Sequence, residues 1–373
     1  MASFTLFAGS NTARTLADDE SGFIGQLGAL STTGTAISAS GAADVTVLGA
    51  LHSSGGNAIN HAGDSIELYV GQLGAIGSTS SDSVAVSFTE TAFVSNDGAL
   101  FSRSDALDIR SSDEGGTIDI LNTGTISGVS DGIVTSSGDQ VTRIVNRGSI
   151  MGADGGIDQL GGDARLINRG DISGEEYGYD GSLDVDFVRN FGSILGGVLG
   201  EEGDDVVLNA GFIDFVDLGD GDDEYEGRGG VVGEDVQGGL GADTLRGGDA
   251  EDLLRGGADN DTLRGRDGDD TLRGDAGDDV LNGAGDDDVL RGGSGADTFR
   301  FAAGHGFDTI LDLADADTID LEALGLRSFG ADVRDAIADA RGGAVIDLYD
   351  DFGLRIFAEG VDASDLTRSD FLL

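Results

Sequence analysis

The stretch GRDGDDTLRGDAGDDVLNG, residues 265–283, consists mostly of aspartate and glycine. Leu272, Val280 and Leu281 are its only large apolar residues. Such a segment cannot bury enough apolar surface to fold alone, because its charges repel one another and chain entropy opposes ordering. Either it is a disordered acidic linker, or cations balance its carboxylates.

This stretch is part of a nine-residue repeat that runs from residue 238 to residue 300. Each repeat has Asp at its sixth position and a large apolar residue at its eighth. The repeats are GGLGADTLR (238–246), GGDAEDLLR (247–255), GGADNDTLR (256–264), GRDGDDTLR (265–273), GDAGDDVLN (274–282), GAGDDDVLR (283–291) and GGSGADTFR (292–300). A linker has no reason to keep an apolar residue in phase, so the pattern favours a folded structure that needs cations.

The repeat resembles the GGxGxDxUx nonapeptide of the RTX (repeats-in-toxin) haemolysin-type calcium-binding proteins. The resemblance implies a parallel β-roll, with two nonapeptides per turn, position eight facing inward and Ca²⁺ between stacked loops. Glycine permits positive φ in such loops, and carboxylate and carbonyl oxygens suit Ca²⁺. The implied metal-binding residues are Asp223, Asp243, Asp252, Asp261, Asp270, Asp279, Asp288 and Asp297, with the loop glycines Gly241, Gly268, Gly277 and Gly295.

A longer repeat occupies the first half of the chain. Its clearest copies are ILNTGTISG (120–128), IVNRGSIMG (144–152) and LINRGDISG (166–174), and the aligned glycines recur every 19–26 residues. This spacing predicts a parallel β-helix with one turn per repeat; the alternative is an antiparallel β-sandwich. The amides two residues before each glycine are expected to hydrogen-bond to one another along the helix axis. They are Asn96, Asn122, Asn146, Asn168, Asn190 and Asn209, with Gln26 and Gln72 in earlier repeats.

The C-terminal region differs from both repeats. Residues 301–325 resemble the segment that closes an RTX roll, the spacing of apolar residues predicts a helix over 331–341, and 344–349 with 354–361 are expected to form a hairpin. The ending VDASDLTRSDFLL resembles the uncleaved signal of type I secretion through an ABC transporter. The start of the chain, by contrast, lacks the basic and apolar regions of a signal peptide.

These patterns predict an all-β protein, a parallel β-solenoid with a small C-terminal α/β cap. We expect a parallel β-helix of about nine turns at 1–198, an RTX calcium-binding β-roll at 199–302, and a cap with a type I secretion signal at 303–373.

Composition limits the partners. The net charge is -49, and all 21 basic residues are arginines. This acidity argues against nucleic acids and anionic membranes as partners, and for cations. No stretch has the roughly 18 apolar residues of a transmembrane helix, and the absence of Cys excludes disulfides.

The sequence contains no convincing motif of a metalloprotease or a lipase. The three histidines, His52, His61 and His305, do not form the HExxH motif of a metalloprotease. A β-helix joined to an RTX module resembles the mannuronan C5-epimerases, which use a Tyr, a His and an Asp in an Asp-Pro-His context, but this chain has no Pro. Arg147 and Arg169 occupy equivalent repeat positions and could line a sugar groove, although balancing nearby acids is the simpler role.

We therefore expect no catalytic residues, and several Ca²⁺ ions as the only cofactors. The predicted function is a secreted, extracellular structural protein that folds on export through an ABC transporter. It would self-assemble, as a homo-oligomer or head-to-tail polymer, into a cell-surface layer, filament or adhesive matrix, with a surface polysaccharide as a further candidate partner. The alternative is a polysaccharide-modifying enzyme, an epimerase or lyase, with an RTX module.

Overall fold

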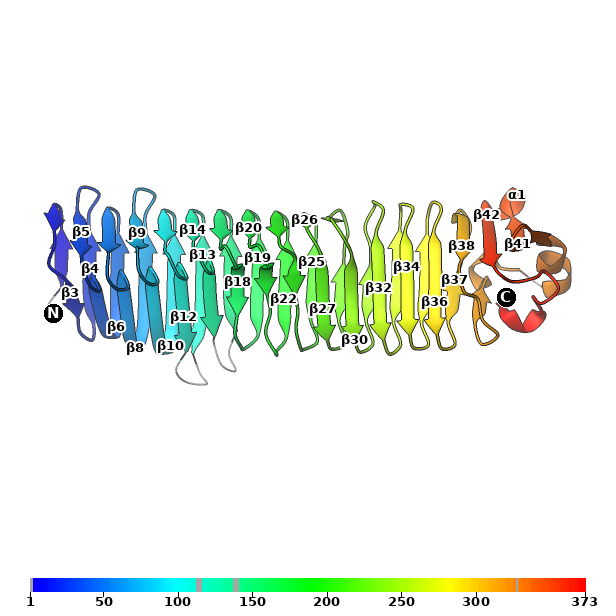
Figure 1. Ribbon diagram of the computed structural model, residues 1–373, viewed down its shortest axis with the longest axis horizontal. Coiled ribbons are helices and arrows are strands. Elements are labelled where there is room, and N and C mark those ends of the chain that lie inside the picture. Colours follow the sequence, from blue (N-terminus) through cyan, green and yellow to red (C-terminus); the bar gives the residue numbers. More distant parts are fainter. Residues whose placement is uncertain (1–2, 112–115, 137–140, 327) are drawn as a thin grey trace. The chain divides into compact units, whose positions relative to one another are not determined.

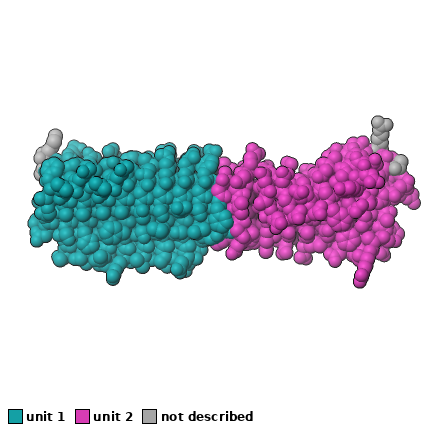
Figure 2. Space-filling model, turned by 90° about the horizontal axis from the view of Figure 1, so that it is seen from above, with its two compact units in different colours: residues 1–202, 212–214 teal, residues 203–211, 215–373 magenta. Residues whose placement is uncertain are grey.

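The computed structural model describes residues 3–111, 116–136, 141–326 and 328–373. Strands make up 55% of it and helices 5%. The chain divides into two compact units, which Figure 2 colours separately. Unit 1 comprises residues 1–202 and 212–214, and unit 2 comprises residues 203–211 and 215–373. Both are parallel β-solenoids, with about 14 turns in all.

A typical turn of unit 1 contains three short strands joined by bends. One turn consists of β16 (Thr142–Asn146), β17 (Ser149–Met151) and β18 (Gly155–Gln159). The next consists of β19 (Ala164–Asn168), β20 (Asp171–Ser173) and β21 (Tyr177–Asp180), and each strand pairs in parallel with its counterpart one turn earlier. Figure 1 shows this succession of parallel strands from β3 to β22. Parallel pairing throughout excludes the antiparallel sandwich.

The other strands of unit 1 extend these three columns. The first column also contains β1 (Phe4–Leu6), β4 (Glu20–Ile24), β13 (Thr117–Asn122) and β22 (Asp186–Asn190). The second contains β2 (Gly9–Ser10), β5 (Ala29–Thr32), β7 (Ala50–Ser53), β9 (Ala75–Ser78), β11 (Ala99–Phe101), β14 (Thr125–Ser127), β23 (Ser193–Leu195) and β26 (Phe212–Ile213). The third contains β3 (Arg14–Leu16), β12 (Leu107–Ser111), β15 (Ile133–Ser136) and β24 (Val198–Leu199). Three long strands, β6 (Ile37–Val47), β8 (Ile59–Val70) and β10 (Val84–Asn96), span the first and third columns.

Alternate residues of each strand face the core of unit 1. In β16, Thr142, Ile144 and Asn146 are buried, whereas Arg143 is exposed. Parallel register places residues of one kind above one another, so that Ile144 stacks on Leu166. The core is therefore built of columns of stacked side chains, as the repeat predicts.

The predicted asparagine ladder is confirmed from Asn96 to Asn190. Nδ2 of each asparagine donates to Oδ1 of the next at 2.8–2.9 Å, and all five side chains are buried. The prediction is wrong for Gln26 and Gln72, which are exposed. In those turns two extra residues precede the glycine, so Val70 takes the inward position one turn before Asn96.

From β30 to β39, unit 2 has two short strands per turn, and each pairs in parallel with the second strand after it along the chain. Its first turns still have three strands, so that β25 pairs with β28 and β27 with β30. Its strands are β25 (Val206–Asn209), β27 (Val216–Asp220), β28 (Glu224–Glu226), β29 (Val231–Val232), β30 (Val236–Leu240), β31 (Thr244–Arg246), β32 (Leu253–Ala258), β33 (Thr262–Arg266), β34 (Thr271–Ala276), β35 (Val280–Ala284), β36 (Val289–Ser294), β37 (Thr298–Arg300), β38 (Gly306–Ile310) and β39 (Thr318–Asp320). The residues at position eight form its thin core. They are Leu245, Leu254, Leu263, Leu272, Leu281, Leu290 and Phe299, each with 0% exposure.

An antiparallel hairpin caps the last turns of unit 2. Strands β40 (Ile337–Ala340), β41 (Gly343–Leu348) and β42 (Leu354–Glu359) pair in order, with helix α1 (Tyr349–Phe352) between the last two. Strand β42 pairs with β38, and β43 (Phe371–Leu372) pairs with β39. The predicted hairpin is therefore confirmed.

The predicted helix over 331–341 is wrong in its second half. A π-helix spans Phe329–Val333 and a 3₁₀ helix Arg334–Ala336, but Ile337–Ala340 form β40, because pairing with β41 satisfies their backbone groups. Further 3₁₀ helices span Glu322–Leu324 and Arg368–Asp370. Among the described residues, every helix is too short and too polar to span a membrane.

Candidate metal sites in unit 2

The loops of unit 2 depend on glycine at the fourth position of the repeat. Gly241, Gly268, Gly277 and Gly295 have φ of 115°, 116°, 146° and 147°, in the region that L side chains rarely adopt. A β-carbon on Gly277 would lie 1.8 Å from the carbonyl oxygen of Asp259, one turn earlier. The predicted loop glycines thus allow successive loops to stack in direct backbone contact.

The sixth-position aspartates form two hydrogen-bonded ladders. The backbone N–H of each donates to Oδ1 of the aspartate one turn later, at 2.7–3.1 Å. The first ladder runs through Asp205, Asp223, Asp243, Asp261, Asp279, Asp297 and Asp317. The second runs through Asp252, Asp270, Asp288 and Asp308. The structure thus brings together, in two rows, all eight aspartates that the sequence assigned to metal binding.

The second oxygen of these carboxylates is what points to a metal. Oδ2 is buried and accepts no hydrogen bond in Asp223, Asp243, Asp261, Asp270, Asp279, Asp288, Asp297 and Asp308. Burying a carboxylate oxygen without a donor or cation is costly. The row of Oδ2 atoms is therefore a set of hard oxygen ligands that lack a counter-charge.

The pKa values of these aspartates reflect the same cost. Burial raises the pKa of Asp261, Asp270 and Asp308 to about 8, and that of Asp243 and Asp288 to about 7. The N–H group that donates to Oδ1 opposes the shift, and neighbouring carboxylates add to it. The carboxylates are thus destabilised as anions unless a cation joins them.

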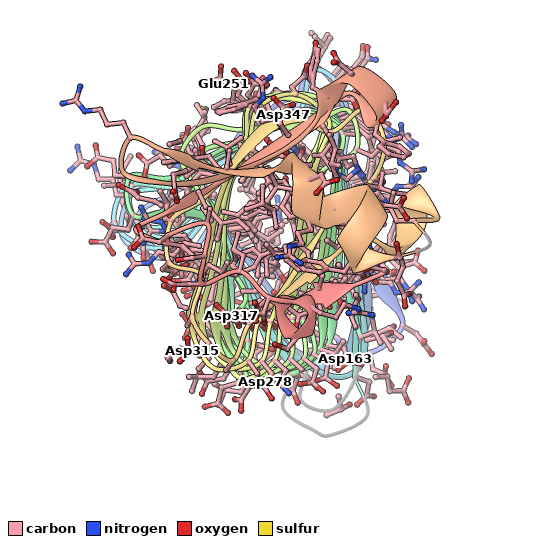
Figure 3. All side chains as sticks on the ribbon, turned by 90° about the vertical axis from the view of Figure 1, so that its right-hand side faces the viewer. Asp163, Glu251, Asp278, Asp315, Asp317 and Asp347 are labelled. Atoms are coloured by element: carbon pink, nitrogen blue, oxygen red, sulfur yellow. The ribbon has the colours of Figure 1, made fainter. Side chains whose placement is uncertain are left out.

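A second set of side chains enters the same gaps from the opposite direction. Oδ1 of Asp278 accepts the N–H of Ala296, one turn later, at 2.8 Å, and Oδ1 of Asp287 accepts that of Phe307 at 2.8 Å. Side chains at position five thus accept N–H groups of the following turn, whereas those at position six accept N–H groups of the preceding turn. The space between two stacked loops therefore receives carboxylate oxygens from both loops. In Figure 3, Asp278 and Glu251 mark the two opposite loop edges of unit 2.

The donor set fits Ca²⁺. No three acidic or histidine side chains converge on one point in the described part of the chain, so backbone carbonyls must supply much of the coordination. A β-carbon on Gly238 would lie 2.1 Å from Asp243 Oδ2 and 2.6 Å from the carbonyl oxygen of Gly256, which shows that both oxygens border one small space. Carboxylate and carbonyl oxygens together are typical calcium ligands.

The surroundings of Asp252 differ from those of the other aspartates. Its Oδ2 accepts the N–H of Gly248 at 2.6 Å. The nearby guanidinium of Arg266 donates to the carbonyl of Gly247 at 2.7 Å and forms an ion pair with Glu226. The Arg266 guanidinium therefore occupies the carbonyl-lined space beside Asp252. Asp252 stays a predicted calcium ligand, but the geometry supports it less than the other aspartates.

The sequence analysis missed Asp308 and Asp317, which extend the two ladders. Their Asp-Thr-Ile segments match the Asp-Thr-Leu of the repeats, but each lies 20 residues after its predecessor, so the strict repeat length hid them. Oδ2 of Asp317 accepts the N–H of Ala314 at 2.8 Å, whereas Oδ2 of Asp308 has no donor. Asp308 thus joins the candidate metal-binding aspartates.

A group of part-buried carboxylates in unit 1 was also missed. The hydroxyl of Tyr177 donates to Oδ1 of Asp131 at 3.0 Å, and Asp158 is the register partner of Asp180 on the neighbouring strand. Burial raises the pKa of Asp158 to about 6 and that of Asp180 to about 7. These residues come from irregular positions of the longer repeat, so no sequence signal joins them.

A family model agrees with this geometry. The family model of the RTX calcium-binding nonapeptide repeat (4 copies) matches residues 233–263 and 264–299. A subunit of the mannuronan C5-epimerase from Azotobacter vinelandii is 31% identical, over 33% of this chain and 78% of that one, with a TM-score of 0.28. The extracellular lipase of Serratia marcescens is 19% identical, over 58% of this chain and 41% of the lipase, with a TM-score of 0.30. No curated protein matches significantly.

The two-stranded turns and the stacked aspartate loops define unit 2 as a calcium-binding β-roll. The chain belongs to the family of proteins that carry the RTX calcium-binding nonapeptide repeat.

Proposed function

We propose that this protein is a secreted calcium-binding structural protein whose unit 2 folds when it meets calcium outside the cell. The observation that carries the proposal is the row of buried Oδ2 atoms without hydrogen bonds. Without a cation, these carboxylates repel one another, and the two thin columns of apolar residues cannot offset the chain entropy.

The same property suits export. At the low calcium of the cytosol the repeats stay unfolded and can pass through a type I ABC transporter. Extracellular calcium fills sites with dissociation constants of about 10⁻⁴–10⁻³ M. The free energy of calcium binding then contributes directly to folding.

Calcium removal tests this proposal. Circular dichroism and limited proteolysis of the whole protein are compared with calcium and after chelation by EGTA. We expect chelation to remove the share of the strand signal that unit 2 contributes and to expose residues 215–310 to protease, with Mg²⁺ failing to restore the fold. Unchanged spectra and cleavage after chelation would contradict the proposal.

Self-association is the second part of the proposal. Among the described residues, β1, β2 and β3 pair on one side only, with β4, β5 and β6. Phe7 and Leu27 beside them are 69% and 88% exposed. Unpaired strand edges are templates for further strands. We propose that copies of the chain join through this edge, as an oligomer or polymer that forms a surface layer, filament or adhesive matrix.

The assembly is tested by sedimentation of the calcium-loaded protein over a range of concentrations. The variant Thr5→Pro removes an N–H group from β1 and should shift the protein to monomer, because proline cannot donate to a strand ladder. Thr5→Ala, which keeps this N–H group, serves as the control. A wild-type protein that is monomeric at every concentration would disprove self-association while leaving calcium-driven folding intact.

A polysaccharide-modifying enzyme, an epimerase or lyase, is the alternative. The shifted carboxyl groups around Tyr177 favour it, because raised pKa values cluster at catalytic sites. A Tyr-His-Asp mechanism is disfavoured: both ring nitrogens of buried His61 contact carbonyl oxygens, of Gly41 and Ser87. New unsaturated ends or altered uronate composition after incubation with alginate or pectin, lost in D158N, would establish the enzyme; unchanged polymers would count against it.

A further inference from the structure

Five arginines lie on one outward face of unit 1, on three successive turns. Arg143 on β16 is the register partner of Arg165 on β19, which is the partner of Phe187 on β22. Arg147 and Arg169, which directly precede repeat glycines, form a second row. Arg189 is the register partner of Ile167, between the two rows. The arginines are Arg143, Arg147, Arg165, Arg169 and Arg189, all exposed, and we call this surface the arginine face.

Most of these arginines have no acidic partner. Of these five arginines, all of which lie in the described part of the chain, only Arg143 forms an ion pair, with Asp119 at 3.5 Å. The guanidinium of Arg165 lies 5.6 Å from the ring centre of Phe187, and those of Arg169 and Arg189 lie 4.5 and 4.8 Å from the ring centre of Phe191. Balancing of nearby acids, the simpler role expected from the sequence, does not apply.

Ion pairs are more frequent among the arginines of unit 2, in a chain with a net charge of -49. Seven of the twelve described arginines of unit 2 form ion pairs with Asp or Glu: Arg228, Arg246, Arg255, Arg266, Arg291, Arg300 and Arg355. On the arginine face, as at Arg255 and Arg273 of unit 2, neighbouring strands about 4.8 Å apart carry like charges side by side, which destabilises the sheet. An anionic ligand would remove this repulsion.

The chemistry of the face indicates which anion it suits. Each guanidinium presents a planar fork that binds a carboxylate through two hydrogen bonds. The half-buried Val145 and Ile167 lie between the arginine rows and offer an apolar strip. Nucleic acid fits poorly, because its dense phosphates would be repelled by a protein of this net charge. A sugar polymer combines spaced carboxylates with apolar C–H faces.

We infer that the arginine face binds an extracellular polysaccharide that carries carboxylates, such as a polyuronate. The inference deepens the proposed structural role and rests on it in one respect, that the protein acts outside the cell. It names the polysaccharide class and the surface that binds it. Because the arginines lie in unit 1 and the calcium ligands in unit 2, the two proposals can fail independently.

Binding is measured with the whole calcium-loaded protein by calorimetry at low ionic strength. The probes are oligogalacturonate too short to gel, neutral dextran, and single-stranded DNA of equal charge. Oligogalacturonate should bind, and the other two should not. The double variant R165Q/R169Q should weaken binding about tenfold or more, because it removes two charge-assisted hydrogen-bonding groups.

Two further variants distinguish a specific site from general charge. R165K/R169K keeps the charge but loses the planar fork, and should lose most of the affinity. R246Q/R255Q removes two paired arginines of unit 2 and should leave affinity unchanged. The inference is overturned if wild type does not bind oligogalacturonate, if DNA binds more tightly, or if R165Q/R169Q binds like wild type. Calcium-induced folding, followed in the same samples by circular dichroism, tests the proposed function separately.

Discussion

The backbone N–H of Asp243 donates to Oδ1 of Asp261 at 2.8 Å, while Oδ2 of both aspartates is buried without a hydrogen bond. One oxygen of each carboxylate is thus fixed by the preceding turn, and the other faces the gap between loops. Protonation and calcium binding are two ways to neutralise the same group. The account therefore predicts that they compete.

We expect the calcium-free protein to be more folded at pH 5 than at pH 8. The aspartate pKa values are raised to about 8 in the folded state for Asp261 and Asp270, above the value of about 3.9 in an unfolded chain. Between these values the folded state holds more protons, so stability without calcium falls as pH rises. Calcium binding to the folded protein displaces those protons, so its calcium affinity rises with pH. Calcium titrations followed by circular dichroism at pH 5, 6.5 and 8 measure both effects, and a midpoint independent of pH would contradict them.

Asp270→Asn should remove about one bound calcium per chain, because the amide lacks the charge that a hard cation requires. Oδ1 of Asp270 accepts the N–H of Asp252, and its Oδ2 accepts no hydrogen bond. Calcium stoichiometry by calorimetry checks this result. Asp315→Asn is the control, because Asp315 is exposed and lies outside the ladders. Equal stoichiometry in both variants would remove Asp270 from the ligands.

Arg266→Gly should increase calcium binding by about one ion. The guanidinium of Arg266 donates a hydrogen bond to the carbonyl of Gly247. The backbone of Arg266 has a φ of 90°, in the left-handed region. Glycine adopts this φ without the strain of about 1–2 kcal/mol that a side chain adds. The substitution also frees the carbonyl of Gly247 to bind an ion. Arg246→Gly, which breaks an exposed ion pair with Glu224, should bind no additional calcium. A loss of calcium in the Arg266 variant would show that this guanidinium supports the neighbouring site.

The repeats made most of this arrangement predictable. Position eight of the nonapeptide indicated the inward residues, such as Leu272, and position six the aspartate ladders, because a solenoid places equal repeat positions above one another. Strict spacing also caused the omission of Asp308, which follows a two-residue insertion. Arg266 and the arginine face depend on which side chains meet across turns, and single-sequence patterns do not encode those contacts. Gln26 was assigned to the ladder because two extra residues in its turn were not recognised.

Asn146→Ala should destabilise unit 1, by about 1–3 kcal/mol for each hydrogen-bonding group left without a partner. Nδ2 of Asn146 donates to Asn168 at 2.9 Å, and its Oδ1 accepts from Asn122 at 2.8 Å, all in the buried core. Urea denaturation in saturating calcium provides the measurement. Thr123→Ala, which removes an exposed hydrogen bond to Asp97, should change stability by less than about 0.5 kcal/mol. Similar values for the two variants would mean that the ladder adds little stability.

The central claim is that calcium, bound between stacked aspartate loops, holds unit 2 folded. Hydrogen–deuterium exchange of the whole protein with and without calcium tests it most directly, because the N–H groups of Asp243, Asp261, Asp270 and Asp288 are themselves ladder donors. The account predicts that chelation abolishes their protection while peptides containing the Asn122–Asn190 ladder of unit 1 stay protected. Equal protection of the aspartate N–H groups with and without calcium would contradict it.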